Sequence, residues 1–454
     1  MGSTTATETA AGAAQGGNGR TRDRGTRELV RFLSNPLRYL DALRDEDGRD
    51  VVPFQLGNQP CHLVTKPELL RLAMHNEDWP PISRGRLMGL TKWYDTGLFL
   101  SYGPEHHRQR DELWKPLFDE PTIPRLAVDR TIRRSETWVE GEPIELYTEL
   151  RSLCWSIDWE ALTGTELTSD LLEALERGVE ALAWLVLPFG PSRWNWPMPQ
   201  SRKTRDAKRK LDALITRMIA ERHASSNGGA ADAAVRADLL TSLVRQAEAD
   251  GVTTDDQIRA TVKMWFGADQ LHALFTWTLY LLGQNASEEA RFHAELDEVL
   301  GGQAPTPEVI PALTYTRKVL KEAMRVYPPV WGFFRQMTED YTLGTEVIPK
   351  GHLMAMSPWV THRDPRLWPD PLRFDPERWN EGADRPPELS YFPFSAGPYE
   401  CHGKALAMKE AVLILATIGQ RWSFRPVDRH EPQPYATWAT EPKRGLRMSP
   451  VRRA

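Results

Sequence analysis

The sequence predicts a mainly α-helical fold with small β-sheets, and three observations carry that prediction. Residues 27–297 are dominated by apolar residues at helical spacing. From residue 321 onward the pattern changes to short strand-like segments separated by turns rich in Pro and Asp. A last helical pattern begins immediately after Cys401. We therefore expect many helices and only short strands.

The individual helices are expected where helical spacing follows a Pro, Ser, Thr or Asp that can satisfy the first backbone amides. They cover residues 67–75, 105–118, 125–139, 171–185, 201–222, 254–282 and 404–419. The helix over 254–282 is the longest and is expected to be central. Short strands are expected at 51–56, 61–65, 341–348 and 353–356, followed by turns through residue 379.

Residues 1–27 are rich in Gly, Ala and Thr and lack an apolar signal-peptide region, which predicts a disordered tail. The loops at 195–201 and 225–234 have neither the length nor the charge bias of a domain linker. Although 454 residues would by default suggest two or three domains, residues 28–454 are expected to form a single one.

Charge and cysteine content exclude several classes of protein. The chain has 57 Lys and Arg against 62 Asp and Glu, a net charge of −5, with the two signs interspersed. This pattern predicts no nucleic-acid or anionic-membrane partner. The longest apolar stretch, residues 181–189, is far below the roughly 20 residues that cross a bilayer. Three scattered cysteines, an odd number, favour a reducing compartment, so a cytoplasmic location is expected.

The segment around Cys401 carries the clearest chemical signal. Cys401 lies in a loop just before a predicted helix, where free amides and the helix dipole stabilise a thiolate. Gly397 and Gly403 allow the backbone to curl around the sulfur. This environment suits an anionic axial ligand of haem iron. The alternative is an unreactive buried cysteine.

Phe394, Gly397, Cys401 and Gly403, at this spacing, resemble the haem-binding signature of cytochromes P450. The resemblance extends over nearly the whole chain after the tail. It implies the cytochrome P450 fold, haem b (iron protoporphyrin IX) as cofactor, and Cys401 as the axial ligand of its iron.

Two further segments are similar to P450 motifs. Glu322 and Arg325 lie three residues apart on one helix face and can pair. With Arg378 they resemble the three charged residues that lock the cysteine loop in the family, a structural role.

His106, Arg110 and Arg335 are candidates for holding the haem propionates, because Arg can grip a carboxylate with two hydrogen bonds. Tyr399 departs from the family, which usually has Arg or His there. One propionate contact is therefore lost or replaced by a phenol.

The central helix departs from the family at one position. Where the family has an acid followed by Thr, this chain has Asp269 followed by Gln270. An amide can donate a hydrogen bond but does not readily release and regain a proton, so Gln270 is expected to be a poor proton relay. Either waters bridge from Asp269 and ordinary monooxygenation survives, or the enzyme forms its oxidant in another way.

Three functions follow from the resemblance. The default is a P450 monooxygenase that oxidises a hydrophobic, aromatic small molecule of specialised metabolism, with Asp269 and Gln270 on the distal side. The second is a P450-fold enzyme without dioxygen activation. It would either use peroxide as the oxidant or act on a substrate that carries its own leaving group. In the second case it would transfer a nitrene or an oxene, or cyclise the substrate. The third is a haem sensor or electron carrier without substrate.

Many of the 17 Trp and several other aromatic residues fall in regions that enclose substrate in the family. These pocket candidates are Trp93, Tyr94, Phe99, Trp184, Phe189, Trp265, Phe266, Ala268, Trp331, Phe333 and Trp438. They predict an apolar, stacking pocket, with core packing as the alternative for each.

No flavin or iron–sulfur motif follows the cysteine loop, so electrons would come from a separate ferredoxin or flavodoxin and its reductase. Arg108, Lys115, Lys404 and Lys409 are candidates for docking that acidic partner. Solvated surface charge is the alternative for them.

Overall fold

The computed structural model describes residues 25–75, 82–83, 90–98, 100–101, 103–118, 120–186, 194–226, 238–383 and 386–453. Residues 25–34 are helical, so this first helix includes the last three residues of the predicted tail; residues 1–24 of that tail lie outside the described part. Helix α2 (Pro36–Asp47) follows, with the Asn35 side chain accepting from the Arg38 amide at 3.1 Å.

The largest sheet has five strands in the order β1-β2-β8-β5-β3. They are β1 (Val51–Leu56), β2 (Gln59–Val64), β8 (Leu353–Met356), β5 (Phe333–Met337) and β3 (Ile82–Ser83). Strand β2 pairs in parallel with β8, and the other pairs are antiparallel. The sheet therefore joins a segment near the start of the chain to one near its end. The predicted strands at 51–56 and 353–356 match β1 and β8.

Three smaller sheets complete the β-structure of the described residues. One contains β4 (Ile144–Glu145), β12 (Arg447–Arg452) and β9 (Trp422–Pro426), and one is the pair β10 (Pro434–Ala436) and β11 (Thr440–Pro442). The third replaces the single strand predicted at 341–348. It is a hairpin of β6 (Tyr341–Leu343) and β7 (Glu346–Ile348), because Gly344 takes the left-handed conformation (φ 62°) between them.

Most of the chain is helical, as predicted. The longer helices, apart from the central pair described below, are α3 (Pro67–Met74), α7 (Ile123–Ser135), α8 (Leu146–Thr163), α9 (Ser169–Val186), α11 (Pro199–Ser226), α12 (Leu239–Asp250), α15 (Ala286–Leu300), α16 (Thr314–Val326) and α18 (Lys404–Arg421). Helix α7 ends four residues before the predicted boundary at 139. Beyond the end of this helix, Trp138 donates its Nε1–H to Glu149 at 2.7 Å.

Short elements fill the connections. They are α4 (Leu90–Tyr94), α17 (Pro358–Thr361) and the single turns η2 (Pro307–Val309), η3 (Pro376–Trp379) and η4 (Gly397–Tyr399). The helix predicted over 105–118 is present but contains a π-helical segment, since α5 (Gly103–Arg108) continues into η1 (Gln109–Trp114) and then α6 (Lys115–Phe118). Such π segments often occur at functional sites.

The central helix predicted over 254–282 is wrong in one respect, because it is broken at residues 269 and 270. Helix α13 (Asp255–Ala268) begins with a capping box of Thr254 and Gln257, and α14 (Leu271–Gln284) resumes after the break. Asp269 has an extended conformation, and its Oδ1 accepts from the Leu271 amide at 2.9 Å. An Asp that satisfies a backbone amide two residues on favours a turn over a continuous helix.

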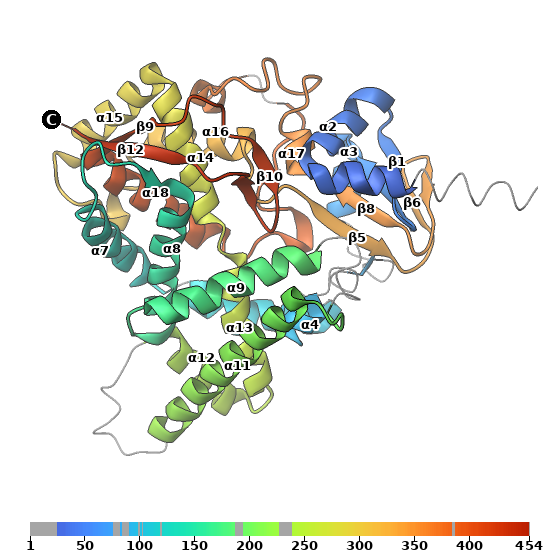
Figure 1. The fold of residues 1–454 in the computed structure, drawn as a ribbon, viewed down its shortest axis with the longest axis horizontal. Coiled ribbons are helices and arrows are strands. Elements are labelled where there is room, and N and C mark those ends of the chain that lie inside the picture. The colour runs from blue at the N-terminus through green and yellow to red at the C-terminus, as the bar shows by residue number, and fades with distance from the viewer. Residues whose placement is uncertain are drawn as a thin grey trace, which may run out of the picture.

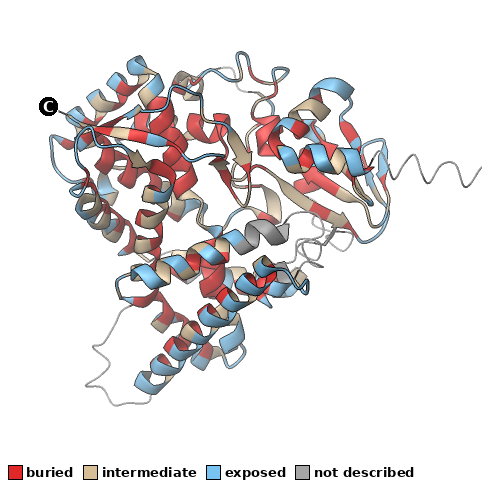
Figure 2. Cartoon of the chain, viewed as in Figure 1, coloured by how far each residue is buried: buried red, intermediate tan, exposed pale blue. Residues whose placement is uncertain are grey.

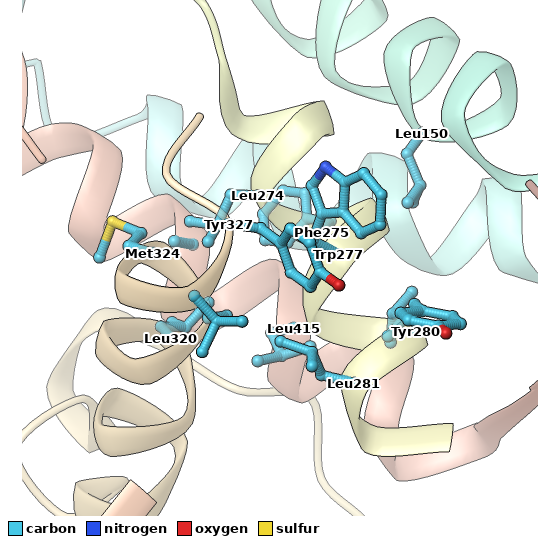
Figure 3. Packing of buried hydrophobic residues seen from close by; sticks show 14 of the residues in the cluster. Leu150, Leu274, Phe275, Trp277, Tyr280, Leu281, Leu320, Met324, Tyr327 and Leu415 are labelled. Atoms are coloured by element: carbon cyan, nitrogen blue, oxygen red, sulfur yellow. The ribbon is translucent and has the colours of Figure 1, made fainter. Parts of the chain in front are cut away.

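The main core surrounds α14. This helix is apolar on all sides and almost entirely buried, as a helix inside a large core must be (Figure 2). Residues from α8, α14, α16 and α18 meet there (Figure 3). Trp277 stacks on Tyr327 at 4.1 Å between ring centroids and donates to the Thr440 carbonyl at 2.8 Å. The core therefore fixes α14 and the strand β11 relative to each other.

Figure 1 shows the arrangement that results. Helices α7, α8, α14, α15, α16 and α18 form one side of the molecule, and the five-stranded sheet with α2 and α3 forms the other. Helices α9, α11, α12 and α13 lie together beyond the first group. None of the described helices has the length and apolar character needed to cross a membrane.

Candidate haem-thiolate site

The loop before α18 is held by backbone hydrogen bonds and by a glycine that no other residue could replace without a shift. The Cys401 amide donates to the Phe394 carbonyl at 2.8 Å, and the Glu400 amide donates to the Gly397 carbonyl at 3.0 Å. Gly397 has φ 68°, and a Cβ there would lie 2.2 Å from the Met74 carbonyl oxygen. Gly397 thus seats the loop directly against the end of α3.

The Cys401 sulfur lies at the start of α18 and is the one exposed thiol among the three cysteines; Cys61 and Cys154 are buried. Desolvation by the surrounding protein and the Glu400 charge raise the pKa of the Cys401 thiol, while backbone amides of Gly403 and Lys404 and the Arg110 charge oppose that rise. Amides directed at the sulfur and a nearby cation are the surroundings of an anionic ligand.

These residues fit a haem iron. A cysteine sulfur with two amide donors becomes a soft, anionic ligand once it loses its proton, and Cys401 is an exposed residue. The loop also connects to α13 through aromatic rings. The Phe118 ring lies 5.5 Å from His402 and 5.3 Å from Trp265. The cysteine loop and the central helices therefore border one region of the molecule.

The predicted charged group Glu322, Arg325 and Arg378 assembles. Arg325 binds Glu322 with two hydrogen bonds of 2.8 and 2.9 Å, and both side chains are fully buried. Arg378 Nε lies 3.3 Å from Glu322 Oε1, and Trp379 Nε1–H donates to Glu322 Oε2 at 3.0 Å.

Arg325 also connects this group to the chain that precedes η3. It donates to the carbonyls of His362, Pro371 and Arg373 at 2.7–3.1 Å. Every atom of this buried pair thus has partners, as a buried ion pair requires.

The three propionate candidates gather around the segment 398–399. Arg110 donates to the Pro398 carbonyl at 2.6 Å, and the His106 ring lies 4.5 Å from the ring of Tyr399. Arg335 is buried, and burial lowers its pKa to about 10 while the Tyr399 phenol opposes the shift. Tyr399 therefore occupies the centre of the group that the sequence assigned to the propionates.

The helix break leaves Ala268 exposed and brings two side-chain donors, Gln270 and Trp438, to one backbone carbonyl. Ala268 is exposed, whereas the seven residues before it are buried. Gln270 Nε2 donates to the Gly267 carbonyl at 3.3 Å, and Trp438 Nε1–H donates to the same oxygen. Gln270 Oε1 has no hydrogen-bond partner among the described residues. The Gln270 amide thus donates a hydrogen bond to a backbone carbonyl that has lost its helical partner at the break.

Sequence reasoning missed a group of buried acids next to Asp269. Asp158 on α8 accepts from Trp265 Nε1–H at 2.8 Å, and burial followed by the charge of Asp269 raises its pKa well above the ordinary value. The same two causes raise the pKa of Glu410 on α18 to about 8. These residues are far apart in the sequence, and a Glu inside a helix carries no local signal of burial. Only the packing of α8 and α18 beside the break brings them together.

The aromatic pocket candidates divide into several groups. Trp93, Tyr94, Trp265 and Phe266 are buried in an apolar cluster with α11, α12 and α13. Trp331 is also buried, and its Nε1–H donates to the Thr437 carbonyl at 3.0 Å.

Phe333 and Trp438 are partly buried, and Trp438 reaches the helix break. Phe99 and Phe189 lie outside the described residues, as does the side chain of Trp184.

The basic residues proposed to dock a redox partner differ in whether an acidic side chain already pairs with them. Arg108 pairs with Glu105 at 3.0 Å and Lys404 with Glu400 at 2.6 Å. Lys115 and Lys409 are exposed.

A family model named cytochrome P450 matches residues 31–447. Two proteins of Streptomyces melanosporofaciens are similar to this chain: cyclooctatin synthase is 34% identical over 91% of each chain, and cyclooctat-9-en-7-ol 5-monooxygenase is 30% identical over 86% of each. Pentalenene oxygenase of Streptomyces avermitilis is 26% identical over 92% of this chain and 93% of its own.

Among solved structures, the retinoic acid-bound cyanobacterial CYP120A1 superposes with a TM-score of 0.77 over 90% of this chain and 93% of that one, at 20% identity. That likeness concerns the fold, which is the mainly α architecture with small sheets described above. With the Cys401 loop, the Glu322 group and a family match over nearly the whole described chain, the protein belongs to the cytochrome P450 family of haem-thiolate oxidoreductases.

Proposed function

We propose that the protein is a monooxygenase of specialised metabolism that binds haem b at Cys401 and oxidises a hydrophobic small molecule. The observation that carries the proposal is the exposed Cys401 thiol at the start of α18, with two backbone amides directed at its sulfur. The other two cysteines are buried and lack such a loop.

When haem is bound, its iron supplies the activation of dioxygen, which takes up two electrons and two protons and delivers one oxygen atom to the substrate. The protein's own residues bind the cofactor, orient the substrate and exclude water. Arg110 and Arg335, which lie beside Pro398 and Tyr399, would hold carboxylates of the cofactor. Ala268 is exposed at the helix break, and Trp438 donates to the Gly267 carbonyl beside it.

The substrate class is inferred from the aromatic side chains and from the relatives. Trp438 and Phe333 offer apolar surface near the break and β5. The names of two relatives specify an alkene and an alkenol. A hydrophobic alkene or alkenol is therefore the first class to test, and an aromatic compound the second.

One observation favours a second candidate function. The Gln270 amide nitrogen uses one of its two N–H groups on a backbone carbonyl, and an amide does not readily release and regain a proton. An enzyme without a hydroxyl at this position could use peroxide or a substrate with its own leaving group, and would then need no ferredoxin or flavodoxin.

The test is turnover of the haem-loaded protein with compounds that shift its Soret band. We expect product containing one oxygen atom from labelled dioxygen only when NAD(P)H, a reductase and a ferredoxin or flavodoxin are all present. Product formed without reductant, from peroxide or from a substrate with a leaving group, would favour the second function. No spectral shift and no product over the whole panel would favour a sensor or electron carrier.

A further inference from the structure

A line of polar side chains runs from the helix break toward the surface. It consists of Asp269 at the break, His272 on α14, Tyr147 on the neighbouring helix α8, and Glu441 on β11. His272 is 3% exposed and Tyr147 is 9% exposed, so the middle of the line is inside the protein. Glu441, at the outer end, is partly exposed.

The inner end contains two buried atoms that face each other. Asp269 Oδ1 is engaged by the Leu271 amide, whereas Oδ2 lies 3.7 Å from His272 Nδ1. Neither Asp269 Oδ2 nor His272 Nδ1 has a hydrogen-bond partner among the described residues. Leaving two buried polar atoms unpaired costs stability, which indicates a role that a static contact would not require.

The outer end continues through Tyr147 to Glu441. His272 Nε2 lies 3.1 Å from the Tyr147 hydroxyl, and the Glu441 carboxyl lies close enough to that hydroxyl for each to shift the pKa of the other. Burial raises the pKa of Glu441, while Tyr147, Thr437 and the Arg151 charge oppose the rise. Burial also raises the pKa of Tyr147 well above its ordinary value, so the phenol stays neutral and can pass a proton only as it receives another.

We propose, building on the dioxygen-dependent function above, that Glu441, Tyr147 and His272 deliver protons to Asp269 and so replace the alcohol that Gln270 lacks. These three are relay residues, and Asp269 is the group that receives the proton. The helix break supports this assignment because it turns the Asp269 carboxyl toward Leu271 and His272 instead of leaving it on a regular helix face.

Each transfer balances. A Glu441 carboxylic acid gives its proton to the Tyr147 oxygen as the Tyr147 hydroxyl gives its own to His272 Nε2. His272 then gives the proton on Nδ1 to Asp269 Oδ2, and Glu441 regains a proton from water. One proton enters at Glu441 and one proton arrives at Asp269. The transfers leave the His272 proton on Nε2, and exchange of the ring protons with water (one released from Nε2, one taken up on Nδ1) restores the starting tautomer.

The charged and titratable groups around this line are consistent with the direction. Asp158 and Glu410 face Asp269, and burial favours their neutral forms, so they add little competing negative charge. Cys154 also lies near Asp269, and burial keeps it a thiol. At the outer end Arg151 lies 5.7 Å from the Tyr147 ring and its charge lowers the pKa of Glu441, as does that of His272, and Tyr435 is a further titratable neighbour of Glu441.

The test uses Tyr147→Phe in the haem-loaded enzyme, because this change removes only the relay hydroxyl. Tyr280→Phe is the matched control: Tyr280 is a buried tyrosine on the same helix as His272 but away from the line. We expect Tyr147→Phe to lower product formed per NAD(P)H by about tenfold or more, since a positioned proton donor contributes that much. Turnover driven by hydrogen peroxide, which brings its own protons, should stay within about twofold of wild type.

Two additions keep the test decisive. Glu441→Gln preserves hydrogen bonding without an acidic proton and should show the same loss of coupling as Tyr147→Phe. Nitrogen-15 NMR of histidine-labelled protein, as the diamagnetic carbon monoxide complex, should show His272 protonated on Nδ1. The His272 Nε2 signal should shift in Tyr147→Phe and not in Tyr280→Phe.

Coupling in Tyr147→Phe equal to that in Tyr280→Phe would overturn the relay, as would identical His272 signals in the two variants. If the wild type makes no product from dioxygen, the proposed monooxygenase function fails instead. The NMR comparison then still decides whether Tyr147 sets the protonation of His272.

Discussion

The cysteine loop and the helix break border the same region of the molecule but satisfy their polar groups very differently. Around the loop, Glu322 alone accepts hydrogen bonds from Arg325, Trp379 and the Asp375 amide. Around the break, Asp269 Oδ2, Gln270 Oε1, His272 Nδ1 and Asp158 Oδ2 all lack partners among the described residues.

This difference indicates where rigidity and reactivity lie. The buried Glu322–Arg325 pair is fully hydrogen-bonded and holds the segments around it rigidly, whereas the unpaired buried atoms at the break are available to bind water or to exchange protons. The loop side is therefore expected to respond to substitution through stability and cofactor retention, and the break side through coupling and product yield. The four predictions below test that division, beginning with the largest effect.

Cys401→Ala should abolish the thiolate-ligated haem spectrum completely, because the other cysteines are buried away from the loop. The measurement is the absorption difference spectrum of the reduced protein with carbon monoxide. Cys154→Ala is the control and should leave that spectrum unchanged. A retained thiolate spectrum in Cys401→Ala would remove the basis of the loop side of the comparison.

Glu322→Gln should destabilise the protein by about 3–5 kcal/mol, because it leaves the buried Arg325 charge without its ionic partner. Denaturant unfolding with and without haem measures the change. Arg447→Ala, which breaks an exposed ion pair with Asp428, should leave the midpoint unchanged. Equal effects of the two variants would show that the Glu322 group does not hold the loop.

Lowering the pH should reduce the free energy of unfolding, because the buried His362 cannot take up a proton in the folded protein. This buried imidazole accepts from the Phe392 amide at 2.8 Å, and burial lowers its pKa from 6.5 to about 3. The unfolded state binds a proton below pH 6.5 and the folded state does not. The stabilisation is therefore complete above pH 6.5 and is lost as the pH falls from 6.5 toward 3, with about 2 kcal/mol gone at pH 5.

The check is the free energy of unfolding at pH 8 and pH 5 in wild type and His362→Gln. The variant should be less stable at both values yet lose about 2 kcal/mol less between them. His62 and His293, whose pKa values burial lowers to about 4, add acid sensitivity of the same sign in both proteins. Parallel pH dependences would contradict the assignment to His362.

Gln270→Thr should have the smallest effect, a change in coupling of less than about threefold, because the proposed relay supplies protons without position 270. Its effect on unfolding should stay below about 1 kcal/mol, the range of a helix N-cap change. Product per NAD(P)H and denaturant midpoints measure the two. A large gain in coupling would place the missing alcohol, not the Tyr147 line, at the centre of proton supply.

The loop side could be predicted from the sequence because its contacts are local or belong to spaced motifs. The spacing of Phe394, Gly397, Cys401 and Gly403 is set by one tight loop, and Glu322 and Arg325 are one helical turn apart. The pairing with Arg378 followed from the resemblance. The reason that Gly397 must be glycine, the Met74 carbonyl against it, comes from a helix near the other end of the chain.

The break side could not be predicted, since its features depend on packing. Helical spacing continues through Asp269 and Gln270, and the sequence gives no Pro or Gly at those positions to mark a break. Asp158, Tyr147 and Glu410 look like ordinary polar positions of helices. They become a buried group only because α8, α14 and α18 meet there.

The contact between Gly397 and Met74 also bears on how the chain can fold during synthesis. Together with the parallel pairing of β2 and β8, it joins segments separated by most of the polypeptide. Long-range contacts of this kind form late, because loop closure must precede them. The sulfur ligand consequently reaches its final position only after nearly the entire chain has left the ribosome, so cofactor capture has to follow translation rather than accompany it.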